Sequence, residues 1–332
     1  MLKRSLQKHK RKWFLFLSIL IFIYFNNSSL LVSTSEEEPL LIAHRGLHQT
    51  FPMEGITNDT CTAERIYEPE HPYLENTIPS MKKAFEVGAH IVELDIHSTT
   101  DGEFVVFHDW TLDCRTDGKG VTREHTSAEL KKLDIGYGYT ADGGKTYPFR
   151  GKGIGMMPTL DEIFAEFPHH SFLINIKSDD PDEGVQLANY LKKLPKSRLD
   201  QLAVYGGEQP IAALQQELPE LRVMSMQTMK DCLIPYIAIG WSGYVPKSCS
   251  HTQLHIPEKF APWLWGWPHR FVQRMEKRDA RVILVAGEGR FSEGFDTEED
   301  IERLPKNYSG GVWTNRIDRV APILLQEKHK KE

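Results

Sequence analysis

The sequence predicts an α/β fold, a TIM-like (β/α)8 barrel in which helices cover a closed parallel sheet. Short apolar runs rich in β-branched residues recur along the chain, at 40–43, 91–96, 104–107, 172–176, 202–205, 222–225, 282–286 and 311–314. Stretches that suit amphipathic helices alternate with many of them, at 79–87, 161–167 and 183–194. Mostly apolar strands that alternate with helices are typical of a parallel sheet buried on both faces. A single domain of about 290 residues favours a closed barrel, which needs roughly 250 residues, over an open sheet.

The first predicted helix has clear boundary signals. Pro79 stands at its start, where the missing N–H costs nothing, and Gly88 follows its last turn.

Two stretches break the alternation of strands and helices. Residues 49–73 are polar and irregular, and residues 109–157 are rich in Gly, Asp and Thr, so we expect a long loop and an insertion with little core of its own.

The N-terminal 35 residues form a separate unit, and we assign residues 36–332 to the barrel domain. Six Lys or Arg fall within the first twelve residues, and the apolar run 13–25 follows them. Either this segment stays in the membrane as a signal anchor, or it is a signal peptide cleaved near Ser33 and Ser35. Both alternatives keep the basic end in the cytoplasm and place the body outside, as a periplasmic or extracellular membrane-anchored domain or as a secreted one.

The charge of the body argues against nucleic acid as a partner. Without the six N-terminal bases the chain has 34 basic and 46 acidic residues, a net charge of −12. A nucleic-acid binder has a broad basic surface instead.

The chain has four cysteines, Cys61, Cys114, Cys232 and Cys249. They contain no CxxC pair, so a structural zinc site is not expected. Disulfides and buried free thiols both remain open.

Polar residues cluster where the predicted strands end, which is where a parallel barrel builds its active site. His44 and Arg45 follow the first run, and His108 follows the third. Glu93 and Asp95 lie two apart on one strand, as do Asn175 and Lys177 on another, so each pair shares a face. Two carboxylates pointing into a buried interior need a partner, and a bound cation would supply one.

These residues form part of a longer set of sequence words. They are HRG at 44–46, ENT at 75–77, ELD at 93–95, TTDGEFVVFHD at 99–109, IK at 176–177 and VWTN at 312–315. In this order they resemble the glycerophosphodiester phosphodiesterase family of the phospholipase C-like phosphodiesterase superfamily. The resemblance is dense over residues 40–177 and thinner beyond them. It implies a TIM-like barrel and metal-dependent hydrolysis of glycerophosphodiesters to an alcohol and glycerol phosphate.

The resemblance also implies catalytic and substrate-binding roles. His44 and His108 correspond to the general acid and base, for which the near-neutral pKa of histidine is suited. Arg45 would neutralise the phosphodiester and the charge that grows in the transition state. Lys177 would bind the phosphate as a point charge.

The implied cofactor is a divalent cation, Ca²⁺ or Mg²⁺, since both prefer oxygen ligands. Glu93 and Asp95 would hold it, and Glu75 of the ENT word is a further candidate. The family usually has a third carboxylate two residues before the lysine, but this chain has Asn175 there. An amide oxygen can bind a hard cation without adding charge, so this departure affects metal affinity.

Two other functions fit parts of the pattern. A lipid phosphodiesterase of the sphingomyelinase D or lysophospholipase D type uses a similar barrel with similar words. A non-catalytic phosphodiester-binding protein would account for Asn175 but not for both histidines. The Trp-rich segment 263–267 suits either packing over the barrel or contact with a lipid surface, because Trp favours membrane interfaces.

Overall fold

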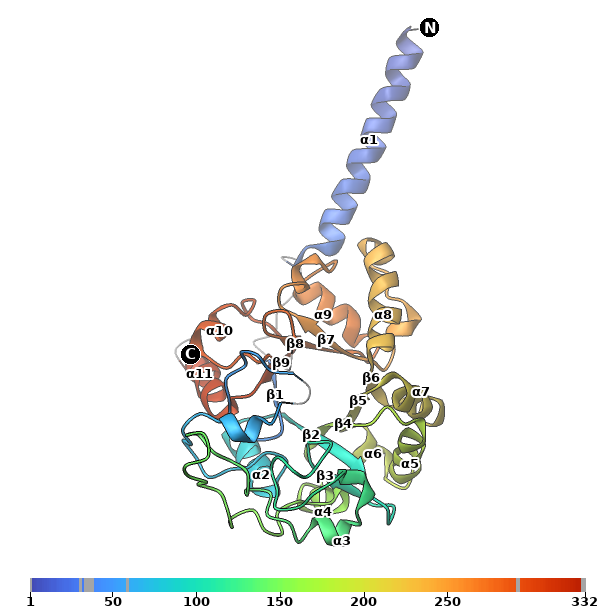
Figure 1. Cartoon of the computed structure of the whole chain (residues 1–332). Helices are drawn as coiled ribbons and strands as arrows, with labels where there is room; N and C mark the ends of the chain where they lie inside the picture. The colour runs from blue at the N-terminus through green and yellow to red at the C-terminus, as the bar shows by residue number, and fades with distance from the viewer. Residues whose placement is uncertain (1, 30–31, 33–38, 58–59, 291–292, 330–332) are drawn as a thin grey trace.

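Parallel strands surround the centre of the molecule in the computed structural model, which describes residues 2–29, 32, 39–57, 60–290 and 293–329. Within these residues the barrel strands run in the order β6-β5-β4-β2-β1-β9-β8-β7 (Figure 1). Their bounds are Leu40–Ala43 (β1), Ile91–Ser98 (β2), Ser171–Ile176 (β4), Leu202–Gly206 (β5), Arg222–Met224 (β6), Gln253–Pro257 (β7), Arg281–Val285 (β8) and Gly311–Thr314 (β9). A bridge between Val223 and Thr252 brings β6 to β7, so the barrel is nearly closed. The predicted TIM-like barrel is confirmed.

Alternating residues on each strand build two layers of core. In β1, Ile42 lies in the cluster inside the barrel with Trp313, whereas Leu41 and Ala43 pack outward against the helices. The covering helices are α2 (Ile78–Val87), α4 (Leu160–Glu166), α5 (Pro181–Leu191), α6 (Lys196–Leu199), α7 (Glu208–Glu217), α8 (Met226–Ile239), α9 (His269–Glu276), α10 (Glu298–Glu302) and α11 (Ile317–His329). This pattern is the two-sided burial that the apolar strands predicted.

The strand after β2 does not belong to the barrel, although residues 104–107 were among the strands predicted from the sequence. β3 (Phe104–Val106) runs antiparallel to β2, with Ile96 paired to Val106. The remaining barrel strand is β7, which was not predicted from the sequence. Its apolar run is interrupted by Gln253, His255 and Pro257. Nε2 of Gln253 lies 2.9 Å from Nε2 of His255, and the ring of His255 contacts Tyr205 and Trp313.

The two irregular stretches pack against each other. They contain short helices, η2 (Thr62–Arg65), η3 (Thr122–Glu124) and α3 (Ser127–Leu130), and the disulfide Cys61–Cys114 joins one stretch to the other. Both contribute to a second buried cluster of Ala63, Ile66, Leu74, Val105, Phe107, Leu112, Leu130, Ile135, Tyr139, Phe149 and Met157. The insertion therefore has more core than the sequence predicted. A second disulfide, Cys232–Cys249, ties α8 to η5 (Lys247–Cys249).

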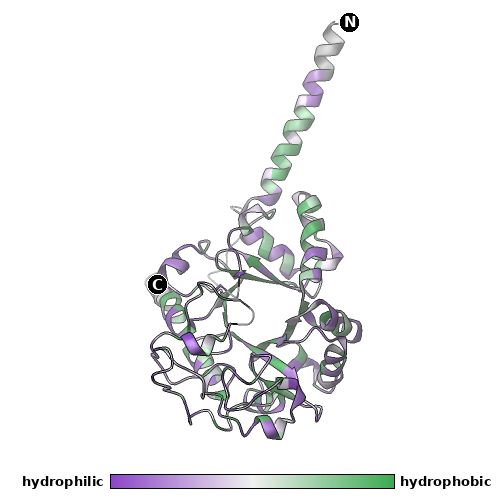
Figure 2. Ribbon diagram, in the orientation of Figure 1, coloured by the Kyte–Doolittle hydropathy of each residue, from purple (hydrophilic) through white to green (hydrophobic). Residues whose placement is uncertain are grey.

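Helix α1 (Leu2–Asn27) projects away from the barrel, and no element among the described residues covers its apolar middle (Figures 1 and 2). Its C-terminal end is attached to the body, because the side chains of Asn26 and Asn27 both donate to the carbonyl oxygen of Trp241, at 3.1 and 2.8 Å. In the part of the chain that the structure describes, no helix has both the length and the apolar content needed to cross a membrane. The candidate cleavage region at Ser33 and Ser35 lies outside the described residues.

The turn after β1 places the HRG word. Arg45 and Gly46 both have positive φ, 54° and 77°, so the chain reverses sharply as it leaves the strand. A Cβ atom on Gly46 would lie 2.5 Å from Oγ of Ser80 and 3.0 Å from its carbonyl carbon. Gly46 thus meets two demands, a left-handed backbone and close contact with the start of α2.

We expect Gly46→Ala to lower the free energy of unfolding by about 2–4 kcal/mol, combining left-handed strain with overpacking. Gly55→Ala is the matched control, because Gly55 also has positive φ, 69°, but nothing lies within 4 Å of its added Cβ. Denaturant unfolding of both variants measures the difference. Equal losses in the two would mean that the contact with Ser80 contributes nothing.

Candidate active site

All eight predicted site residues lie at one end of the barrel. They come from β2 and β4, from the residues that follow β1, β3 and β4, and, for Glu75, from the loop before α2. These residues are His44, Arg45, Glu75, Glu93, Asp95, His108, Asn175 and Lys177, and the contacts below link them into one network. β2 and β4 pair in register, with Asp95 opposite Asn175. As predicted, Asn175 and Lys177 share a face, since both reach Asp95, and Glu93 and Asp95 share a face, since both contact Arg45.

Asp95 is almost completely buried, and both of its carboxylate oxygens have polar partners. Its Oδ1 accepts a hydrogen bond from Nδ2 of Asn175 at 2.8 Å and lies 3.5 Å from Nζ of Lys177. Its Oδ2 accepts from Nδ2 of Asn76 at 2.9 Å and lies 3.3 Å from Nε of Arg45. Burial raises the pKa of Asp95, but Lys177, His108 and Arg45 outweigh it and hold the pKa well below its usual value.

Glu93 sits beside Asp95 in a less cationic environment. Its Oε1 accepts from the hydroxyl of Tyr205 at 2.6 Å, and its Oε2 accepts from the backbone N–H of Arg45 at 3.1 Å. Burial and the neighbouring Asp95 raise the pKa of Glu93 to about 8. Two buried carboxylates side by side resist ionising together, which is the condition that a cation relieves.

Glu75 holds two arginines in place. Its Oε1 accepts from Nη1 of Arg45 at 3.1 Å, and its Oε2 pairs with Nη1 of Arg115 at 3.1 Å. Burial raises the pKa of Glu75, but Arg115 and Arg45 outweigh that effect and lower it. Since both oxygens face guanidinium groups, a role for Glu75 as cation ligand would require one of these pairs to open, and it stays a prediction.

His44 is oriented through its Nδ1 atom. That nitrogen lies 2.6 Å from Oδ1 of Asn315, and Nδ2 of Asn315 donates to Asp296 at 2.9 Å. Because an amide oxygen only accepts, Nδ1 of His44 carries the hydrogen and Nε2 is left for chemistry. The ring packs on Trp313 at 4.8 Å between centroids, and Nε2 lies 3.8 Å from Oε2 of Glu93.

His108 is held in the same way by a different partner. Its Nδ1 lies 2.7 Å from Oδ1 of Asp109, whose Oδ2 pairs with Nε of Arg115 at 2.9 Å. Burial raises the pKa of Asp109, but Arg115 and His108 hold it well below its usual value, so His108 has an anionic partner. Burial lowers the pKa of both histidines, most strongly that of His44.

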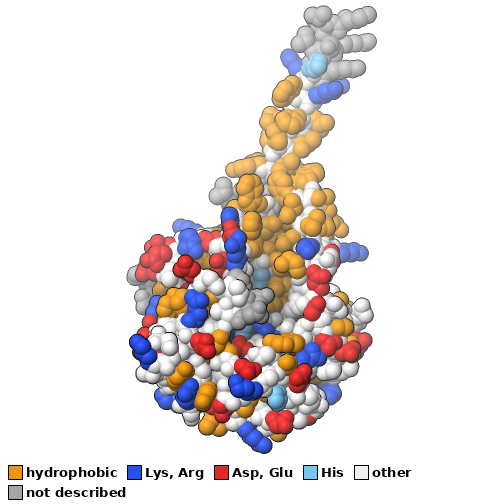
Figure 3. Space-filling view, viewed as in Figure 1, with side chains coloured by type: hydrophobic (Ala, Val, Ile, Leu, Met, Phe, Trp, Pro, Cys, Tyr) orange, Lys and Arg blue, Asp and Glu red, His pale blue; other side chains and the backbone are white. Residues whose placement is uncertain are grey.

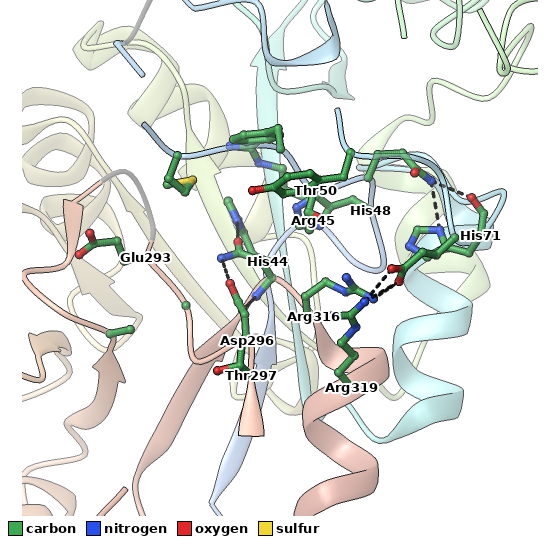
Figure 4. A pocket seen from close by; sticks show the side chains of 18 of the residues that line it. His44, Arg45, His48, Thr50, His71, Glu293, Asp296, Thr297, Arg316 and Arg319 are labelled. Carbon is green, nitrogen blue, oxygen red and sulfur yellow. Dashed lines mark hydrogen bonds and ion pairs between the residues drawn. The ribbon is translucent and has the colours of Figure 1, made fainter. Parts of the chain in front are cut away.

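A cavity of about 780 Å³ opens beside His44. It extends from His44 and Arg45 over the loop after β1 to Arg316 and Arg319 at the start of α11 (Figure 4). Both arginines pair with Glu70 at the rim. Phe51, Met53 and Tyr67 also line the cavity. The space is therefore polar at its inner end and partly apolar toward solvent.

The oxygen atoms of Glu93, Asp95 and Asn175 form the set that suits a hard cation. Nδ2 of Asn175 now points at Asp95, and a turn of the amide about its Cβ–Cγ bond would present Oδ1 there instead. Among the described residues, no group of three or more His, Cys, Asp or Glu has a metal-holding arrangement. The donor set fits a divalent cation with two charged ligands rather than three.

Several residues of the site were not predicted from the sequence. Tyr205 and Asn315 each end or follow a predicted strand, so the rule that found His44 would have found them too. Asp296 and Arg115 carry no such signal. They lie in loops, and only the packing of the chain brings them against Asn315 and Glu75.

Comparison with known sequences identifies the family. Residues 44–226 match the model of the glycerophosphoryl diester phosphodiesterase family. A glycerophosphodiester phosphodiesterase of Caldanaerobacter subterraneus subsp. tengcongensis is 38% identical over 138 residues, which are 42% of this chain and 44% of that protein. One of Bacillus subtilis is 37% identical over 124 residues, 36% of this chain and 39% of that protein. The matched stretch thus spans less than half of each relative.

Comparison with solved structures agrees on the fold. The glycerophosphoryl diester phosphodiesterase domain of a Mycobacterium tuberculosis protein aligns with a TM-score of 0.61 at 16% identity, over 88% of this chain and 100% of that one. An Oleispira antarctica phosphodiesterase in complex with the product sn-glycerol-3-phosphate aligns at 0.51 with 18% identity, over 87% and 97%. With more than half of its length matched by the family model, the chain belongs to the glycerophosphoryl diester phosphodiesterase family.

Proposed function

We propose that this chain hydrolyses glycerophosphodiesters to an alcohol and glycerol phosphate. The observation that carries the proposal is a pair of histidines, His44 buried and His108 partly buried, each fixed through Nδ1, beside two carboxylates and two cationic side chains. A phosphodiester bound there meets positive charge from Arg45 and Lys177. The family relatives of C. subterraneus and B. subtilis carry the name of this activity.

The histidines divide the proton transfers. One imidazole accepts a proton at Nε2 from the water that attacks phosphorus, and the other donates a proton from Nε2 to the departing alkoxide. Asn315 and Asp109 fix the rings so that these nitrogens face the reacting groups. Arg45, anchored by Glu75, is positioned to stabilise charge on the phosphoryl oxygens without reorganising during the reaction.

We also propose that Glu93, Asp95 and the amide oxygen of Asn175 hold a divalent cation, Ca²⁺ or Mg²⁺. When bound, such a cation acts as a Lewis acid toward a phosphoryl oxygen. The oxygen donors and the mutual repulsion of Glu93 and Asp95 support this proposal. With a ligand charge of −2, we expect weak binding that the substrate phosphate strengthens.

The apolar rim of the cavity favours a second candidate substrate. Phe51, Met53 and Tyr67 line a space larger than a glycerol phosphate group requires, and Met53 and Tyr67 are exposed. A diester with an acyl chain, as in a lysophospholipase D or sphingomyelinase D reaction, would cover these side chains.

For the N-terminal segment we propose a membrane anchor with the body outside the cytoplasm. The basic residues before the apolar run favour this orientation. The hydrogen bonds from Asn26 and Asn27 to Trp241 support retention of the helix rather than its cleavage, because they attach its C-terminal end to the body.

We expect turnover of water-soluble glycerophosphodiesters that falls roughly 10²- to 10⁴-fold in His44→Ala and in His108→Ala, the range for loss of a general acid or base. His169→Ala is the control, since His169 is exposed and precedes β4, at the end of that strand opposite the site.

A panel of soluble diesters and lysophospholipids, assayed with Ca²⁺, Mg²⁺, Mn²⁺ and Zn²⁺ in turn, identifies the substrate class. Substrate binding without turnover under every condition would leave the protein a phosphodiester-binding protein.

Asn175→Glu should tighten binding of the free cation, because it restores a third charged ligand. Asn175→Gln lengthens the side chain equally without adding charge, so comparing the two isolates the electrostatic effect. Calorimetric titration with Ca²⁺ and Mg²⁺ measures the affinities. Identical affinities in the native protein and both variants would place Asn175 outside the cation site.

A reporter enzyme fused after Glu332 should be active only outside the cytoplasm. The positive-inside rule predicts this outcome from the six N-terminal bases. Replacing those bases with Gln provides the control, since it removes the orientation signal. A reporter active in the cytoplasm of the unmodified fusion would overturn the proposed orientation.

A further inference from the structure

Exposed apolar side chains lie near the C-terminal end of α1, where Asn26 and Asn27 bond to Trp241 and Ser29 bonds to Gly266. They come from the end of α8, from η4 (Gly240–Ser242) with the residues after it, and from η6 (Ala261–Trp263). We name this surface the apolar collar and define it as Ile234, Ile237, Ile239, Trp241, Tyr244 and Trp263. Figure 3 shows apolar side chains continuing from the helix onto the adjoining part of the body. Trp263 is 81% exposed and Ile234 64%.

The collar is a second apolar face rather than a gap in the core. Ile234, Ile237 and Trp241 are spaced i, i+3 and i+7, so they line one side of α8 and its continuation. Cys232 and Tyr236 already form the buried side of the same helix. Apolar groups on both sides of a surface helix are costly in water and indicate that the outer side meets a second apolar medium.

The collar and α1 are held together as one unit. Arg274 donates from Nη1 to Oδ1 of Asn27 and from Nη2 to the carbonyl oxygen of Asn26, each at 2.9 Å. Nε1 of Trp265 donates to the carbonyl oxygen of Ile237 at 2.9 Å, which links the Trp-rich segment to α8. Whatever medium surrounds α1 therefore lies directly against the collar.

The charge pattern of this region favours a lipid surface. The chain has 46 acidic residues, but within residues 232–275 the only one is Glu258. The bases of this stretch are Lys247, Lys259, Arg270 and Arg274, of which Lys259 pairs with Glu288. Trp and Tyr beside an excess of basic groups are the composition of protein surfaces that sit among lipid headgroups.

The length of the apolar run points the same way. Residues 13–25 extend about 20 Å along a helix, whereas a bilayer core is roughly 30 Å thick. An apolar surface next to a membrane helix can sink roughly 5–10 Å into the headgroup and acyl boundary. Residues 13–25 are therefore too short to span the bilayer core alone, and the collar would supply further apolar surface at the end of α1 next to the body.

We propose that the collar is a lipid-docking surface, embedded in the outer leaflet of the membrane into which α1 inserts. The proposal rests on the insertion of α1 and adds a second membrane contact, made by the barrel itself. A helix and a collar together fix the body at the membrane surface, whereas a helix alone would leave it free to tilt.

Site-specific labels on the full chain test the proposal. The four native cysteines form disulfides, so an added cysteine supplies a unique reactive thiol. Ile237→Cys and Trp263→Cys report on the collar, Ser18→Cys reports on α1, and Ile154→Cys is the control, an exposed apolar residue of the insertion. Each variant is labelled with an environment-sensitive fluorophore and reconstituted into phosphatidylcholine–phosphatidylglycerol vesicles. Quenching is then compared between nitroxide-labelled lipid and aqueous iodide.

We expect the labels at positions 18, 237 and 263 to be quenched several-fold more strongly by the lipid nitroxide than the label at 154, which iodide should quench. Lipid quenching at 18 with iodide quenching at 237 and 263 would overturn the collar proposal and leave the anchor intact. Iodide quenching at 18 would overturn the anchor itself. Protection of 237 and 263 from both quenchers would mean that protein, such as a second copy of the chain, covers the collar.

Discussion

Asp95 is an almost fully buried carboxylate, and the arrangement of the site follows from the need to stabilise its charge. A buried anion without partners would be far too costly to keep ionised. Arg45 and Lys177 supply opposite charge, and Asn76 and Asn175 donate hydrogen bonds to it. These donors come from separate loops and strands, so one carboxylate ties several barrel elements together.

The same network explains why two irregular stretches belong to the site. Arg115 lies in the insertion, yet it pairs with Glu75 and Asp109 and so helps to fix both Arg45 and His108. The disulfide Cys61–Cys114 holds the adjoining residue against the loop after β1. The insertion therefore helps to hold Arg45 and His108 in place.

Much of the fold and site was accessible from the sequence, for identifiable reasons. The apolar run of β1 is continuous, so its bounds were predicted as the structure has them. β7 was missed because Gln253 and His255 break its apolar run, and the pairing of Gln253 with His255 and the packing of His255 on Tyr205 and Trp313 appear only in the folded chain. His108 was predicted to lie in the site because it follows an apolar run, but that run, β3, is not a strand of the barrel. It reaches the site because β3 folds back along β2, and Phe107 donates its backbone N–H to the carbonyl of Asp95.

The sequence by itself determined the barrel, the family and the residues that meet at its mouth, because strand periodicity and spacing are local properties of the chain. The tertiary structure alone decided the partners of those residues. Asn315 orients His44, and Arg115 neutralises Glu75, through contacts between residues far apart along the chain. Asp109 orients His108, its neighbour in sequence, because the loop after β3 turns the two side chains toward each other. Such contacts depend on how loops pack, which no local pattern encodes.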